Sequence, residues 1–290
     1  LDYALINVTG PDNSITSFRE ELEGKSQNLS NSFNLLYAES GTIVLTIDVF
    51  DAAGNQGTAE RFYEYVYDPS GTIDFNIKLQ YNSEPLVLFE PFIYPDGRSI
   101  DFTRISFYIS EVTLDDENIV NVEFHNLTDS HATSILASQG YNWTVEGVPP
   151  GFFSTLSFNI GVPAELNEKD PGEFPSGHPL AKPSENWFGW KSFVFLKVEG
   201  NMDMDGDGTR ETGIALHTGA DEALRNISLD NPILINDGER TEIDIVFDVY
   251  DLFDGQNRIF PIDDFAQIHS LSQIDAVNEL SDNLTNAIKN

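Results

Sequence analysis

Apolar and polar residues alternate along most of this chain, and the alternation predicts β-strands. The run from Ile43 to Phe50 places apolar side chains at every second position. Further strand-like runs follow after Thr72: TIDFNIKLQY, RISFYISEVTL, VNVEFHNL, FFSTLSFNIGV, SFVFLKVEG, TGIALHTG and TEIDIVFDVYDLF. Successive side chains of a strand point to opposite faces, so alternation indicates strands with one buried face. Turn residues separate the runs, which favours an antiparallel β-sandwich or barrel and an all-β fold class.

The C-terminal stretch has instead the spacing of an amphipathic helix. Its apolar residues recur at intervals of three and four, at Ile274, Val277, Leu280, Leu284 and Ile288. That spacing places them on one helical face. Ser272 is the predicted N-cap, with Asp275 at the capping-box position. We expect one α-helix over residues 272–288, packed back on the larger sandwich.

Two domains are expected, with the Pro/Ser/Gly turn YDPSG as the boundary. Residues 1–68 include GTIVLTIDVFDAAGNQGTAE, which resembles the last hairpin of bacterial immunoglobulin-like surface modules. That resemblance implies a small β-sandwich and says little about function, because such modules are spacers as often as binders. We expect residues 71–290 to form the second, larger β-sandwich domain.

The charge balance narrows the classes of partner. The chain has 290 residues, with 15 Lys and Arg against 48 Asp and Glu, a net charge of −33. Such a surface repels nucleic-acid phosphates and anionic membranes, so neither is an expected partner. The acidity fits either a solvated surface or an affinity for cations, and composition leaves both open. With 40% hydrophobic residues, the chain has enough apolar surface to fold.

Several classes of chemistry are excluded or find no support. The chain has no cysteine, which excludes thiol catalysis, thiolate zinc sites and iron–sulfur clusters. No nucleophile elbow, phosphate loop or H-E-x-x-H motif is present, so we expect no enzyme. No apolar run is long enough for a transmembrane helix. The chain opens without a leader, so we expect any signal peptide to have been removed; oligomeric state stays open.

One short stretch raises the question of a site. Residues 186–191 read NWFGWK and contain Trp187 and Trp190, with His178 before them and His217 after them. The two tryptophans are either core aromatics or the wall of a site. Three-residue spacing in a strand would place them on opposite faces. His217 is either a hydrogen-bonded strand residue or a ligand, and His178 is either a loop residue or a ligand.

The order of segments in the second region resembles a known family. The segments are ISFYISEVTL, EFHNLTD, VPPGFFSTLSFNIGVPAELN, WFGWKSFVFLKVEG, IALHTGAD and IVFDVYDLFDG, followed by the helix. This order, from Thr72 to Ile288, is similar to the methanobactin-associated copper-binding protein family, the MbnP-like domain. The resemblance implies an exported β-sandwich, in the periplasm or at the cell surface. It also implies copper on imidazoles beside a kynurenine, which a di-haem peroxidase of the MauG type makes from tryptophan. Imidazole suits copper on chemical grounds as well.

The resemblance assigns candidate copper-site residues one by one. His217 matches the family's F-H-x-G histidine, and Trp187 and Trp190 match its tryptophan pair. Glu168 stands where the family often has a histidine, and His178 is the candidate replacement. The first hypothesis is an exported copper-binding protein that uses His217, with Trp187 or Trp190 nearby and His178 as a further ligand. The second is a surface adhesion or glycan-binding module that keeps the scaffold without the copper site.

The remaining histidines carry no metal prediction. His125 matches a family histidine that is more often a strand residue than a ligand. His131 and His269 have no motif support, and we expect both to be solvated or capping residues.

A second candidate site is the loop NMDMDGDGTRE. Its carboxylates follow a D-x-D-x-D-G pattern with an acid at the ninth position: Asp203, Asp205, Asp207 and Glu211. Alternating carboxylates around a glycine bend suit calcium, a hard cation with oxygen ligands. Ile214 takes the place of the final EF-hand glutamate, so the loop is not an EF-hand. The alternative is an acidic hairpin turn in which Gly206 and Gly208 supply positive φ.

Overall fold

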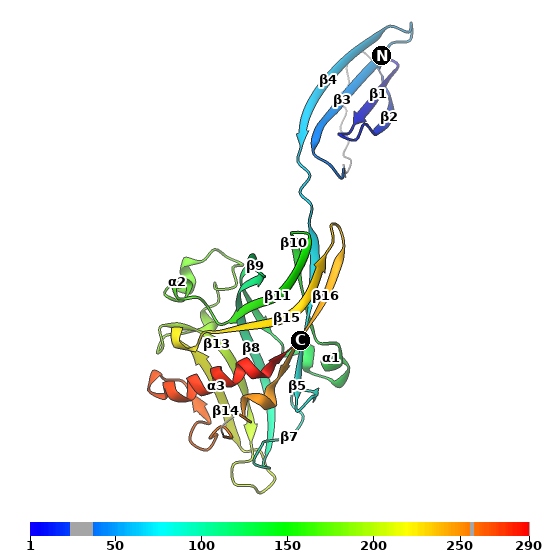
Figure 1. Cartoon of the computed structure of the whole chain (residues 1–290). Coiled ribbons are helices and arrows are strands. Elements are labelled where there is room, and N and C mark those ends of the chain that lie inside the picture. The colour runs from blue at the N-terminus through cyan, green and yellow to red at the C-terminus, as the bar shows by residue number, and fades with distance from the viewer. Residues whose placement is uncertain (24–36, 256–257, 290) are drawn as a thin grey trace. The chain divides into compact units, whose positions relative to one another are not determined.

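The computed structural model describes residues 1–23, 37–255 and 258–289. Contacts divide the chain into two compact units, Leu1–Pro69 and Ser70–Asn290, and both are built mainly from strands (Figure 1). No helix among the described residues is long and apolar enough to cross a membrane.

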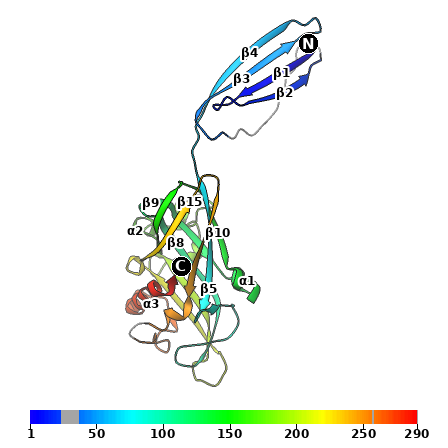
Figure 2. The same ribbon diagram turned by 45° about the vertical axis from the view of Figure 1, so that its right-hand side comes forward.

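The first unit is an antiparallel sheet of four strands in the order β2-β1-β3-β4 (Figure 2). Its strands are β1 (Tyr3–Thr9), β2 (Ile15–Glu21), β3 (Gly41–Phe50) and β4 (Gln56–Tyr65). Val8, Tyr37 and Ile43 form a small buried cluster on it. The described residues of this unit contain this one sheet, so the two-sheet form expected of the module stays a prediction. Residues 24–36 lie outside the described part.

The second unit contains two larger sheets that share one hydrophobic core. The smaller sheet has the order β10-β5-β16-β18, with β6 beside β5. It comprises β5 (Gly71–Tyr81), β6 (Glu84–Pro85), β10 (Tyr141–Val148), β16 (Arg240–Asp248) and β18 (Ile288–Lys289). Every second residue of β5 is buried, as the alternation in TIDFNIKLQY predicts.

The larger sheet has the order β15-β11-β8-β13-β14-β17, with β7 and β9 beside β8 and β12 beside β13. Its strands are β7 (Phe92–Ile93), β8 (Ser99–Leu114), β9 (Glu117–Asn126), β11 (Gly151–Ile160), β12 (Asn186–Trp187), β13 (Ser192–Met202), β14 (Thr212–Gly219), β15 (Arg225–Ile235) and β17 (Gln267–Ile268). The mostly-β sandwich with a C-terminal helix is therefore confirmed. Not every strand pair is antiparallel, however, because β5 pairs with β16, and β14 with β17, in parallel.

Strand β13 is buried on both faces over its first seven residues. One face joins the core, and the segment between β11 and β12 covers the other. In that segment Phe174 packs on Phe193, and the Pro179 carbonyl accepts a hydrogen bond from the Tyr108 hydroxyl at 3.3 Å. This covering segment carries the chain to Trp187 at the edge of the sheet.

The described residues of this unit also form three α-helices: α1 (Ser134–Gln139), α2 (Ala164–Asn167) and α3 (Ile274–Ala287). The predicted C-terminal helix is α3, which packs against β14 and β15 (Figure 1). The expected cap at Ser272 is wrong. Ser270 instead accepts the Ser272 backbone N–H at the start of a short 3-10 turn, and α3 begins after Gln273 without a side-chain cap.

Candidate metal centre

Two histidines lie side by side at one edge of the larger sheet. Strand β17 adds to β14 in parallel, with Ala215 opposite Gln267 and Leu216 opposite Ile268. One step further along both strands, His217 and His269 meet. Neighbouring strands lie about 4.8 Å apart, and the centroids of the two imidazoles are 5.2 Å apart with a T-shaped arrangement of the rings.

Trp187 forms a wall of this histidine pair. Its indole stacks on the His269 ring with centroids 5.6 Å apart and planes 25° apart. The indole N–H donates to the backbone carbonyl of His269 at 3.1 Å, while the backbone N–H of His269 donates to the Gln273 side chain. These bonds fix His269 on both sides. The Trp187 side chain is 41% exposed, so the histidine pair borders on solvent.

A carboxylate on β13 contacts His217. Glu199 is paired with Ala215 across the strands, so it lies diagonal to His217, within reach of a long side chain. Its Oε1 lies 2.9 Å from the His217 Nε2. That hydrogen bond is the largest influence on the Glu199 carboxyl and lowers its pKa, against the opposing effect of burial.

Arg104 lies opposite Glu199 in the strand register and belongs to a partly buried group of charges. Lys197 is 7% exposed and lies opposite His217 in the strand register. It pairs with the buried Glu185 at 2.7 Å, and Arg104 pairs with Glu185 at 3.0 Å. Burial alone would raise the pKa of Glu185, but its bonds to these two cations outweigh that effect and lower it.

The ring of His269 has one nitrogen engaged and one free. Its Nε2 lies 2.9 Å from the Gln267 side-chain oxygen. Its Nδ1 is buried and has no hydrogen-bond partner among the described residues. Burial, and next the neighbouring His217, lower the pKa of His269. A buried polar atom without a partner needs an explanation, and an unprotonated imidazole nitrogen is a good ligand for copper.

Comparison with known proteins bears on the second unit. The MbnP family model matches residues 70–270. The chain belongs to the MbnP family. A solved structure, MbnP from Methylosinus trichosporium, matches with 12% sequence identity over 64% of this chain and 78% of that chain, at a TM-score of 0.42. A comparison with curated proteins finds no match.

The tryptophan pair of the MbnP-like motif is divided between surface and interior. Strand β12 ends at Trp187, and a turn follows in which the Trp190 N–H donates to the Trp187 carbonyl at 3.0 Å. The turn, rather than extended strand geometry, therefore separates the two side chains. Trp190 is 5% exposed, and its indole N–H has no partner among the described residues. Its ring packs on Gly219, where a Cβ atom would come within 2.3 Å of it.

His178 is not brought to the histidine pair. Its ring stacks on Phe174 at 4.7 Å, and its Nδ1 accepts the backbone N–H of Leu180. In the described part of the chain it makes no contact with His217 or His269. Glu168, the residue in the place of a family histidine, ends α2 as its C-cap.

Of the two histidines expected to be solvated or capping, one is buried. His131 is fully buried and accepts the backbone N–H of Leu79 at 3.0 Å. His269 is the second member of the pair. The sequence held one signal for it, because ALH at 215–217 and QIH at 267–269 place a histidine at the same point of a short strand pattern.

The acidic loop after β13 gathers its four carboxylates. Ligand oxygens of Asp203, Asp205, Asp207 and Glu211 lie within 4.8 Å of one another. Asp203 is 3% exposed and accepts three backbone N–H groups of the loop, from Gly206, Asp207 and Gly208. Among the described residues, this is the one group of three or more acids or histidines so closely spaced. Calcium binding at this acidic loop stays a prediction.

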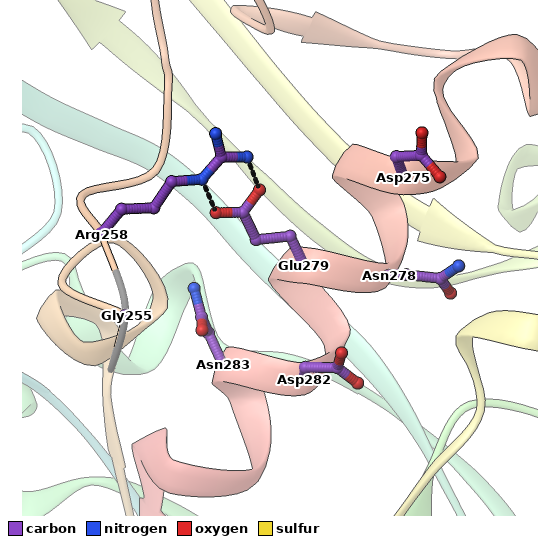
Figure 3. A pocket seen from close by; sticks show the side chains of 7 residues that line it. All are labelled: Gly255, Arg258, Asp275, Asn278, Glu279, Asp282 and Asn283. Carbon is purple, nitrogen blue, oxygen red and sulfur yellow. Dashed lines mark hydrogen bonds and ion pairs between the residues drawn. The ribbon is translucent and has the colours of Figure 1, made fainter.

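A pocket of about 360 Å³ lies on the exposed side of α3 and has different chemistry (Figure 3). Its lining residues are Gly255, Arg258, Asp275, Asn278, Glu279, Asp282 and Asn283. Arg258 binds both oxygens of Glu279, at 2.9 and 2.6 Å. The lining contains no histidine, so this pocket is not the candidate copper site.

Proposed function

We propose that this protein is an exported, non-enzymatic copper-binding protein with His217 and His269 as its protein ligands. Membership of the MbnP family supports the class of protein, and the family resemblance is the basis for export to the periplasm or cell surface. Copper itself is supported by the donor set, since the pair offers two imidazoles and the chain has no thiol. His269 takes the role that the sequence suggested for His178.

The single observation that carries this proposal is the free Nδ1 of His269. It is a buried nitrogen without a partner, on a ring 5.2 Å from that of His217. Buried polar atoms ordinarily have a hydrogen-bond partner. The ring nitrogens of His125 also have none among the described residues, but that ring lies among aromatic side chains, whereas His269 lies beside a second imidazole. A ligand for both rings at once accounts for the unsatisfied nitrogen and for the paired arrangement.

Trp187 is the tryptophan that we propose for oxidation by a di-haem peroxidase partner. It stacks on a proposed ligand and is 41% exposed, so a partner protein could reach it. Trp190 is buried against Gly219 and is the poorer candidate. Kynurenine in place of Trp187 would add an amine and a carbonyl beside the two imidazoles.

The test is copper analysis after loading the full chain with copper(I) and desalting it. We compare the wild type with His217→Ala, His269→Ala and His178→Ala, and we record the mass of the peptide that covers Trp187. The expected result is copper retained near one equivalent by the wild type and by His178→Ala, and lost in the other two variants.

His178→Ala is the matched control, because it removes an imidazole from the same unit without touching the pair. Full copper retention in either His217→Ala or His269→Ala would contradict the assignment. If mass spectrometry shows kynurenine at position 187 and the wild type still retains no copper, the copper function itself fails.

A glycan-binding or adhesion function remains the alternative, and one observation favours it. Phe188 is 90% exposed next to the partly exposed Trp187, and exposed aromatic side chains suit stacking on sugars or on a partner surface. Binding to a glycan array that Phe188→Ala abolishes, in a protein without bound copper, would support this reading over copper binding.

A further inference from the structure

We propose that Glu199 and Gln267 are positioning residues that hold hydrogen on the Nε2 of both imidazoles, so that each ring presents its Nδ1 lone pair to the metal. The inference rests on the proposed copper function and adds to it the ligating atoms and the two side chains that select them. Metal-binding histidines commonly donate their other ring N–H to an oxygen acceptor in this way.

For His217, the chemistry of the partner decides the tautomer. Glu199 Oε1 lies 2.9 Å from Nε2, and a carboxylate can only accept a hydrogen bond. The proton must therefore be on Nε2. In the neutral ring, Nδ1 is then the nitrogen with the free lone pair, and no described residue occupies it with a hydrogen bond.

For His269, the orientation of the Gln267 side-chain amide decides the tautomer. The Gln267 side-chain N–H₂ donates to the backbone carbonyl of Gly213 at 2.6 Å. This bond turns the amide oxygen toward His269, where it lies 2.9 Å from Nε2. An amide oxygen accepts and does not donate, so Nε2 of His269 carries the proton and its buried Nδ1 is free.

The strand register explains why the two hydrogen-bond acceptors, Glu199 and Gln267, belong to different strands. Glu199 reaches His217 from β13, while Gln267 lies in β17, two residues before His269. Because each imidazole is held at Nε2 by its own acceptor, the two Nδ1 atoms are the ones left for a shared ligand.

The first test reads the tautomers directly in the metal-free protein. Nitrogen and carbon NMR of histidine-labelled protein distinguishes Nε2–H from Nδ1–H, with signals assigned from His217→Ala and His269→Ala. We expect Nε2–H in both rings, protected from solvent exchange. In the diamagnetic copper(I) protein, these Nε2–H signals should persist while the Nδ1 resonances shift. An Nδ1–H tautomer in either ring, or loss of Nε2–H on loading, overturns the inference.

The second test separates positioning from folding. Glu199→Gln keeps an oxygen that can accept from His217, whereas Glu199→Leu removes it. We expect copper(I) affinity to change little in the first and to fall by about 10- to 100-fold in the second, as for other residues that orient a metal ligand. Glu199→Leu should also lose the exchange protection of Nε2–H. Glu242→Leu, at an exposed position of β16, is the matched control and should bind copper as the wild type does.

The two proposals fail in different ways. If the wild type carries kynurenine at position 187 and binds no copper, but both rings show protected Nε2–H, the proposed function fails and the tautomer assignment stands. If copper binds through His217 and His269 and Glu199→Leu retains full affinity and exchange protection, the positioning role fails and the copper function stands.

Discussion

Replacing His125 by phenylalanine is expected to make the second unit less sensitive to acid. His125 is 1% exposed, and neither of its ring nitrogens has a partner among the described residues. Its neighbours are aromatic, with Trp143 at 4.7 Å, Tyr141 at 5.4 Å and Phe107 at 5.9 Å between ring centroids. Burial lowers the pKa of His125 to about 3, so the folded protein keeps this ring neutral.

The magnitude follows from proton linkage. In the unfolded chain the imidazole has its ordinary pKa of about 6.5, so below that pH the unfolded state binds a proton that the folded state does not. Stability is therefore lost as the pH falls from about 6.5 toward 3. Each pKa unit corresponds to about 1.4 kcal/mol. Between about pH 7 and about pH 5, this residue alone should cost about 2 kcal/mol of unfolding free energy.

Tryptophan fluorescence during urea denaturation is the suitable assay. The three tryptophans, at positions 143, 187 and 190, all lie in the second unit, so the signal reports that unit alone. Wild type and His125→Phe are each unfolded near pH 7 and near pH 5. The wild type should lose about 2 kcal/mol more than the variant on acidification, because every other titrating group, including the buried His131, is common to both.

An equal loss in both proteins would refute the reasoning. It would mean that His125 gains a proton in the folded state at ordinary pH, and that the aromatic surroundings do not exclude the charged form. A variant that is less stable near pH 7 by a constant amount would report a packing cost of the larger ring and would leave the pH argument intact.

Two further predictions concern the packing of Gly219 and the acidic loop after β13. Gly219→Ala is expected to destabilise the second unit by about 1–3 kcal/mol, because its Cβ would lie 2.3 Å from a Trp190 ring atom and 2.9 Å from the Phe193 carbonyl. Gly213→Ala on the same strand meets open space, so equal effects on the denaturation midpoint would contradict the packing argument. Calcium is expected to raise the thermal midpoint of the second unit, with a stabilisation of about 2.7 kcal/mol at a hundredfold excess over the dissociation constant. Asp205→Asn should reduce that shift, and a calorimetric scan with no shift in calcium would show that the loop is an acidic turn.

The sequence by itself determined the long strands, the C-terminal helix and one half of the candidate site. Local patterns were sufficient for the strands, as in β5, where every second residue is buried, and for helix α3, which follows its three- and four-residue spacing. The order of short motifs was sufficient to indicate the family and to select His217 and the tryptophan pair. These signals are readable because each one depends on neighbours within a few residues along the chain.

Only the tertiary structure decided which histidine joins His217. His269 follows a strand of two residues, too short to show a period, and its meeting with His217 depends on parallel pairing between segments about fifty residues apart. Burial of His125 and His131 was hidden for a related reason, since a strand or turn histidine looks the same in the sequence whichever layer covers it. Alternation specifies which side chains share a face, but the register and the covering segments determine which of them touch.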